Sequence, residues 1–184
     1  MLLYRVFPYL PGAPAGQPGH PLYVDAASQG RGRWDNPNLY RTMYLSLLAE
    51  AAIGETFGNL VRWSPRMLDF PALAGSVRAL GTFECDEGTH PLLDLDDAGV
   101  LSQRGIRPTH VVIRNRPRTQ QIAAAIYAER LWSGIHWWSY HRPQWTAIAL
   151  WDLGPLAVLN VEDIATHPAV AAAARTLCKP RRGI

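Results

Sequence analysis

The chain has 184 residues, of which 48% are hydrophobic and 18% are charged, with a formal net charge of +3. This length fits a single domain, and this composition excludes a chain that is mainly disordered. Part of the positive charge lies in the tail, at Lys179, Arg181 and Arg182, so the excess is too weak to indicate nucleic-acid binding.

Targeting and metal signals are not found in the sequence. The longest apolar stretches are far shorter than the roughly 18 residues that a membrane span needs, and the N-terminus lacks the pattern of a secretory signal. The sequence therefore predicts a cytoplasmic protein without a membrane segment. Cys85 and Cys178 stand far apart with no metal-ligand spacing, so neither a zinc site nor a disulfide framework is expected.

Short strands separated by long loops are expected in the first 45 residues. Alternating and β-branched residues favour strands, whereas runs of Pro, Gly, Asn and Asp favour loops. On this basis we expect strands at residues 2–7, 22–25 and 42–45, with loops at 8–21 and 26–41.

Helices and further strands are expected in the rest of the chain. Ser46 is a plausible N-cap for a helix over residues 47–57 that ends at Gly58, and Pro117 suits the start of a helix over 118–131. The other expected elements are strands at 77–83, 134–140 and 145–151 and helices at 97–104 and 162–178. No internal repeat is visible, so we predict one α+β domain over residues 1–184, with a mixed β-sheet core flanked by helices.

Glu55 is the most informative single residue. At about 100° per residue it falls between Leu48 and Ala51, within the apolar stripe of its helix, so its carboxylate is expected to face inward. An unpaired buried carboxylate costs several kcal/mol, so it is kept by a partner group or by a chemical role. The alternative is that Glu55 lies in a frayed last turn and bends out to water.

A loop over residues 30–37, with the sequence GRGRWDNP, contains a second candidate site. Its glycines allow a ligand to approach the backbone, and the planar guanidinium groups of Arg31 and Arg33 suit paired hydrogen bonds to phosphate. The alternative is a solvated turn whose arginines form ion pairs with Asp25 or Asp35.

The segment over residues 132–141 is dense in aromatic residues, whose planar rings favour stacking on a planar ligand. Tryptophans on neighbouring strands more often fill a core, and the histidines of this segment are more often structural than metal ligands. Ser139 lacks the glycines of a nucleophile elbow, so it is expected to act as a hydrogen-bonding group. No Walker A or GxGxxG motif is present, which argues against P-loop and Rossmann sites.

Taken in order, these motifs resemble the RES domain, a family of bacterial toxins named after its arginine, glutamate and serine. The family's GGRWN loop is similar to residues 32–36, its tyrosine-bearing strand and glutamate helix to residues 44–55, and its Gln-x-x-Ala helix and Asp-Gly-Ile-x-x-x-Ser segment to residues 120–123 and 133–139. The opening strand with Arg5 also resembles the family, and the resemblance extends over about residues 3–153. It indicates Arg33, Tyr44, Glu55 and Ser139 as site residues.

The sequence departs from the family pattern at three positions. Arg31 breaks the first glycine pair, Asp35 replaces an asparagine, and Ser133 stands where the family favours aspartate. Arg31 is therefore a second candidate for phosphate binding beside Arg33, and Ser133 is regarded as a bystander.

The resemblance implies a fold like that of ADP-ribosyltransferases and cleavage of the bond between nicotinamide and ribose in NAD⁺. Glu55 would stabilise positive charge on the ribose or hold its hydroxyls, and Arg33 would bind the pyrophosphate. Tyr44 and Ser139 would contact the nicotinamide-ribose end. NAD⁺ is the substrate, with no further cofactor and with inorganic phosphate as a candidate co-substrate.

The resemblance also implies a partner, an Xre-type helix-turn-helix antitoxin that covers the active-site cleft. Three points stay open at this stage: the acceptor of the ADP-ribosyl group (water, phosphate or protein), the oligomeric state, with a homo-oligomer as one option, and the activity itself. The alternative functions are an ADP-ribosyltransferase with a protein target and a non-catalytic module that binds a nucleotide or a protein.

Overall fold

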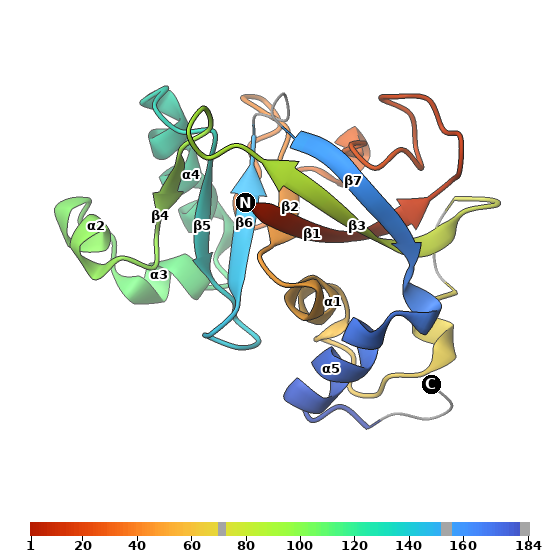
Figure 1. Ribbon diagram of the computed structural model, residues 1–184. Helices are drawn as coiled ribbons and strands as arrows, with labels where there is room; N and C mark the ends of the chain where they lie inside the picture. Colours follow the sequence, from red (N-terminus) through yellow and green to blue (C-terminus); the bar gives the residue numbers. More distant parts are fainter. Residues whose placement is uncertain (70–72, 152–155, 181–184) are drawn as a thin grey trace.

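A seven-stranded mixed sheet organises the residues that the computed structural model describes, which are 1–69, 73–151 and 156–180. Its strand order is β4-β5-β6-β2-β1-β3-β7 (Figure 1), and only β4 and β5 pair in parallel. The strands are β1 (Leu2–Tyr9), β2 (Met43–Ser46), β3 (Val77–Cys85), β4 (Leu92–Asp94), β5 (Gly134–Trp138), β6 (Thr146–Leu150) and β7 (Leu156–Asp163).

Helices flank this sheet in two groups (Figure 1). One group lies beside β4 and β5: α2 (Ala98–Gln103), α3 (Pro108–Val112) and α4 (Arg116–Ala128). The other group, α1 (Ala49–Phe57) and α5 (Pro168–Thr176), packs together through Ile53, Phe57, Val170 and Ala173. A mixed sheet with helices on its flanks confirms the predicted α+β class.

The sheet opens between β1 and β2. β1 pairs with β3 over its whole length, from Leu2↔Glu84 to Tyr9↔Val77, but it meets β2 at a single register pair, Tyr4↔Ser46. Beyond Tyr4, none of the described strands pairs with β1 on that side. The hydrogen-bonding edge left open there is bordered by a cavity.

The strand expected at residues 22–25 is wrong. Backbone carbonyl groups in and just before this segment bind a side chain instead, because Arg5 Nη1 donates hydrogen bonds to Pro21 O at 3.1 Å and to Tyr23 O at 3.0 Å. A guanidinium group thus satisfies backbone acceptors that a neighbouring strand would otherwise bind. The segment stays irregular and lies against β1.

Two predicted helix boundaries are also wrong. Ser46 does not cap α1 but belongs to β2, where it pairs with Ala147 of β6, and Leu48 takes the N-cap position. The helix expected over 162–178 is shorter than predicted. Only α5 (Pro168–Thr176) is α-helical in this range, because the strand β7 extends to Asp163. Pro168, which lacks a backbone N–H, stands at the first turn of α5, and the His167 side chain caps it by accepting from Ala169 N.

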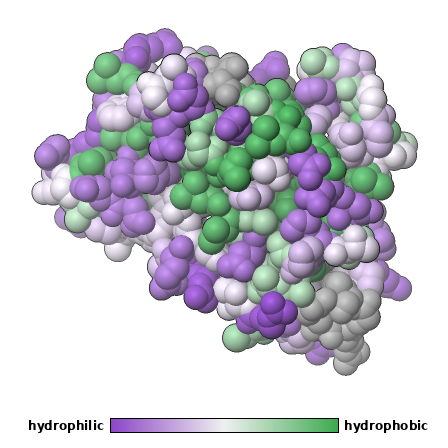
Figure 2. All heavy atoms as spheres, viewed as in Figure 1, coloured by the Kyte–Doolittle hydropathy of each residue, from purple (hydrophilic) through white to green (hydrophobic). Residues whose placement is uncertain are grey.

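The surface of β3 and β7 is partly apolar. Figure 2 shows hydrophobic side chains gathered on this face, and the exposed large hydrophobic residues of the three strands at this edge of the sheet are Leu2, Val77, Val158 and Leu159. None of the described helices is long and apolar enough to cross a membrane. Residues 152–153, at the end of the family resemblance, and the tail residues Arg181 and Arg182 lie outside the described residues.

Candidate active site

A cavity of about 820 Å³ lies where β1 and β2 separate. Ligand-binding pockets commonly measure roughly 300–1,000 Å³, so it has room for a ligand of dinucleotide size. Its walls come from β1, the loop that precedes β2, β2 itself, α1, the first residue of α4 and the end of β5. Segments that are distant in sequence therefore share one cavity.

The loop over residues 30–37, called the arginine-containing loop below, is built around a buried carboxylate. Asp35 Oδ2 accepts hydrogen bonds from Gly30 N at 2.9 Å and Gly32 N at 2.6 Å, while Oδ1 accepts from the Tyr44 hydroxyl at 2.7 Å. Asp35 is only 2% exposed. Its charge is therefore balanced by three donors within the fold, and the departure from the family's asparagine supplies an acceptor for all of them.

Helix α4 fastens the same loop from the other side. Gln120 Nε2 donates to Gly30 O and Gly32 O, each at 3.0 Å, and Thr119 Oγ1 donates to Arg33 O. The loop also depends on a glycine at position 32, where a Cβ atom would lie 2.3 Å from the Tyr44 hydroxyl oxygen. The loop is thus a rigid support rather than a solvated turn.

Arg33 lies on the cavity wall in a fixed orientation. Its Nη1 donates to Val111 O at 2.9 Å and to Ile113 O. Burial lowers the pKa of Arg33, Arg116 lowers it further, and Glu55 opposes both by raising it. Within the described residues Arg33 forms no ion pair with Asp25 or Asp35, so the alternative of a simple surface ion pair is wrong.

Arg31 lies elsewhere. Its side chain is exposed and does not line the cavity, although Gly32 and Arg33 beside it do. Two residues that neighbour each other in sequence therefore face different surroundings. Of the two arginines expected to bind phosphate, the structure brings only Arg33 to the cavity.

Glu55 faces the cavity rather than the core. It belongs to the last turn of α1, its side chain is exposed, and it lines the same cavity as Arg33. The inward orientation expected from the helical wheel is thus corrected: Glu55, with Ala52, borders an open cavity, whereas Ala51 of the same stripe is buried in the core. The carboxylate does not bend away into bulk water, because the Ser139 hydroxyl donates a hydrogen bond to its Oε1.

Ser139 lies behind this carboxylate. It is 1% exposed and is not part of the cavity wall, and its oxygen accepts from His141 N at 3.0 Å. These bonds occupy the hydroxyl, so in this structure Ser139 positions Glu55 rather than facing the cavity itself. The predicted contact of Ser139 with the nicotinamide-ribose end stays a prediction.

Tyr44, from β2, borders the cavity with its ring and uses its hydroxyl inside the protein. The hydroxyl donates to Asp35 and accepts from Trp34 N at 2.9 Å, and the ring meets Trp137 edge-on at 6.4 Å. Burial and the neighbouring Asp35 raise the pKa of Tyr44 well above its ordinary value, so the phenol is neutral at physiological pH. Tyr44 thus supports the arginine-containing loop.

Sequence reasoning missed Arg116, the first residue of α4, which also lines the cavity. No motif marks this residue, since the neighbouring Pro117 indicates only a helix start. Arg5, on the opening strand that resembles the family, also borders the cavity, and burial lowers its pKa to about 10.

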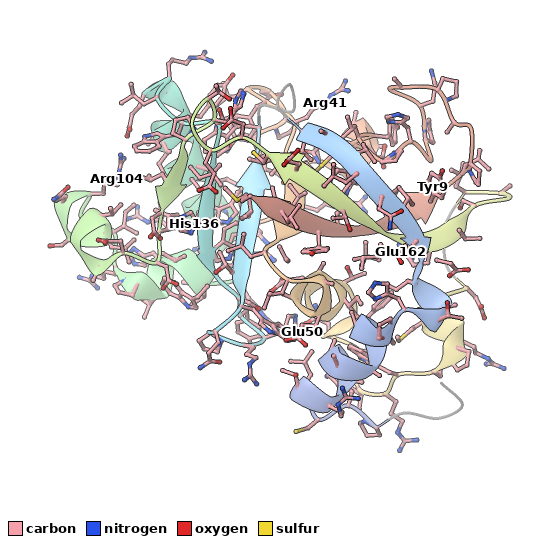
Figure 3. All side chains as sticks on the ribbon, viewed as in Figure 1. Tyr9, Arg41, Glu50, Arg104, His136 and Glu162 are labelled. Carbon is pink, nitrogen blue, oxygen red and sulfur yellow. The ribbon has the colours of Figure 1, made fainter. Side chains whose placement is uncertain are left out.

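The tryptophans mainly fill the core. Trp34, Trp63, Trp145 and Trp151 are buried, whereas Trp137 is buried and also borders the cavity. His136 and Glu50 lie on different elements, β5 and α1 (Figure 3). No group of three His, Cys, Asp or Glu side chains among the described residues has a geometry that could hold a metal ion.

Comparisons with known proteins agree with this fold. The chain is similar in fold to a chain in the crystal structure of the M. tuberculosis MbcT–MbcA toxin–antitoxin complex, with a TM-score of 0.62, 15% sequence identity, and coverage of 97% of this chain and 89% of that chain. No curated protein sequence matches significantly. The family profile of the RES domain matches residues 3–172, which is most of the chain. The protein therefore belongs to the RES domain family.

Proposed function

We propose that this protein cleaves the bond between nicotinamide and ribose in NAD⁺ and acts as the toxin of a toxin–antitoxin pair. The observation that carries the proposal is that the Glu55 carboxylate and the Arg33 guanidinium line one cavity of about 820 Å³. A carboxylate stabilises the positive charge that develops on a ribose, and a guanidinium binds a pyrophosphate. NAD⁺ carries both groups.

The proposed reaction needs little more than electrostatics and positioning. As the bond from the ribose carbon to the nicotinamide nitrogen breaks, its electron pair leaves with nicotinamide, which becomes neutral. The ribose gains oxocarbenium character, which Glu55 stabilises, and an oxygen nucleophile then bonds to the same carbon and loses its proton. Water, inorganic phosphate and a protein side chain are the three candidate nucleophiles.

Release of nicotinamide from NAD⁺ by the purified protein, with and without phosphate, tests this proposal. Glu55→Gln keeps the size of the side chain but removes its charge, and we expect it to lower the rate roughly 100-fold. Glu50→Gln is the matched control on the same helix, because Glu50 binds the indole Nε1 of Trp145 at 3.2 Å and does not line the cavity. We expect it to retain activity within about 2-fold.

The products distinguish the alternatives. The mass of the ADP-ribosyl product identifies water or phosphate as the acceptor, and a mass shift on a protein indicates a transferase. Folded wild-type protein that releases no nicotinamide under any of these conditions would instead indicate a non-catalytic module that binds a nucleotide or a protein.

The toxin role is tested in bacterial cells. Its support is the RES domain match together with the likeness of the fold to a chain from a toxin–antitoxin complex. Expression in the cytoplasm should deplete NAD⁺ and stop growth, whereas Glu55→Gln should do neither. Co-expression of an Xre-type helix-turn-helix antitoxin should restore growth, and continued growth with normal NAD⁺ during wild-type expression would contradict the proposal.

A further inference from the structure

Arg116 has a buried nitrogen without a partner. It opens α4, is half-buried and lines the cavity, and its Nη1 finds no hydrogen-bond acceptor anywhere in the described part of the chain. A buried N–H of a charged group that stays unpaired is unfavourable by at least ~1–3 kcal/mol. Such a group at a cavity wall is typical of a position that a ligand satisfies.

A second guanidinium group lies close to it. After burial, Arg116 has the largest effect on the pKa of Arg33, which it lowers. This effect indicates that the two positive charges lie near each other, as does their place on the same cavity wall. Neither arginine forms an ion pair with a carboxylate of the described residues, and Arg33 Nε and Nη2 have no acceptor among those residues. The repulsion between the two charges is relieved when an anion binds between them.

The spacing of the two arginines is fixed by the fold. Thr119, one helical turn after Arg116, donates to Arg33 O, and Gln120 holds the carbonyl groups of Gly30 and Gly32. Arg33 is in turn anchored on the carbonyls of Val111 and Ile113. Two planar donors held in this way are suited to a diphosphate, whose two groups each accept paired hydrogen bonds.

We infer that Arg116 is a substrate-binding residue that, together with Arg33, binds the diphosphate of the dinucleotide. This inference rests on the proposed function and extends it, since it divides the cavity into an anion subsite at Arg33 and Arg116 and a ribose subsite at Glu55. Arg116 contributes affinity for the diphosphate rather than chemistry at the ribose.

Binding of ADP-ribose, which contains the diphosphate but not the bond to be cleaved, tests the inference by calorimetry. We expect Arg116→Ala to weaken binding about 10- to 100-fold, the effect of losing hydrogen bonds to a charged group. Arg118→Ala removes an equal charge from an exposed position of the same helix and should change affinity less than about 2-fold. Inorganic pyrophosphate should displace ADP-ribose from the wild type.

Thermal unfolding separates this role from a structural one. Because Arg116 Nη1 has no partner to lose and is unfavourable while unpaired, Arg116→Ala should keep or raise the thermal midpoint of the wild type. A lowered midpoint with unchanged ADP-ribose affinity, equal losses in Arg116→Ala and Arg118→Ala, or no binding of ADP-ribose by the wild type would each overturn the inference. Since ADP-ribose binding requires no cleavage, absent nicotinamide release would contradict only the proposed function.

Discussion

The hydroxyl of Ser139 donates a hydrogen bond to Oε1 of Glu55 and thereby joins the end of β5 to the last turn of α1. A serine hydroxyl has one proton, and here the carboxylate receives it while the backbone N–H of His141 donates to the same oxygen. The orientation of Glu55 in the cavity therefore depends on a residue that does not line the cavity.

Ser139→Ala should lower kcat about 10-fold or more and change KM little, because the carboxylate loses its fixed orientation but not its charge. It should also lower the free energy of unfolding by about 1–3 kcal/mol, since the backbone N–H of His141 loses its acceptor. Steady-state kinetics and urea denaturation measure these effects. Ser133→Ala, which removes only a contact with His90 at 3.2 Å, is the control, and an equal loss of kcat in it would contradict the prediction.

Arg33→Ala should raise KM for NAD⁺ roughly 10-fold or more, whereas Arg31→Ala should change it less than about 2-fold. The reason is that Arg33 lies on the cavity wall and Arg31 is exposed outside it. Arg33→Lys should not restore the affinity, since an ammonium group cannot reproduce the anchored planar fork. Equal effects at the two positions, or a larger one at Arg31, would reverse the assignment.

Tyr40 should make stability depend on pH above pH 10. Burial raises the pKa of Tyr40 to about 12, and its hydroxyl donates to Trp34 O at 2.8 Å. Below pH 10 both the folded and the unfolded forms keep the proton, so the contribution is fully present. Between pH 10 and 12 only the unfolded form ionises, so the free energy of unfolding falls, by up to ~1.4 kcal/mol per pH unit.

Urea denaturation at pH 8 and pH 11 checks this effect. The difference in the free energy of unfolding between wild type and Tyr40→Phe should shrink by roughly 1 kcal/mol at the higher pH. A difference for Tyr40→Phe that is the same at both pH values would refute the assignment.

Gly54→Ala should destabilise the protein, although alanine is favoured over glycine in helices by about 1 kcal/mol. A Cβ at position 54 would lie 2.3 Å from Cζ3 of Trp145, whose ring is held by its hydrogen bond to Glu50. Overpacking of this kind costs about 1–3 kcal/mol, so the clash outweighs the helix preference. Chemical denaturation should show a smaller loss when Trp145→Phe provides room, and a stabilised single variant would contradict the packing argument.

Much of the fold could be predicted from local patterns. Alternation and turn residues predicted β1, β3, β5 and β6, and the helical period of residues 118–131 predicted α4. The prediction failed where pairing between distant segments decides the structure. Ser46 has the chemistry of a helix cap, but it belongs to β2 because it pairs with Ala147 of β6. β7 is an edge strand whose mostly exposed residues do not alternate between apolar and polar, so no strand signal is visible there in the sequence.

The candidate site could be predicted less completely. The order of the motifs identified Arg33, Tyr44 and Glu55, and the structure brings all three to one cavity. The helical wheel could not distinguish a core from a cavity wall, so it gave Glu55 the wrong surroundings. Nothing local could reveal that Ser139 reaches Glu55 from 84 positions away, or that the start of α4 brings Arg116 to the cavity beside Arg33.

The bonds from Thr119 and Gln120 to the arginine-containing loop also determine when the site is assembled during synthesis. The loop leaves the ribosome early, but the side chains that secure it are made more than 80 residues later. A chain that ends before α4 has Arg33 on a loop without its hydrogen bonds to Thr119 and Gln120, and it lacks Ser139 altogether. A fragment that ends before α4 therefore lacks part of the candidate site, and only a chain that extends past Ser139 contains all of its residues.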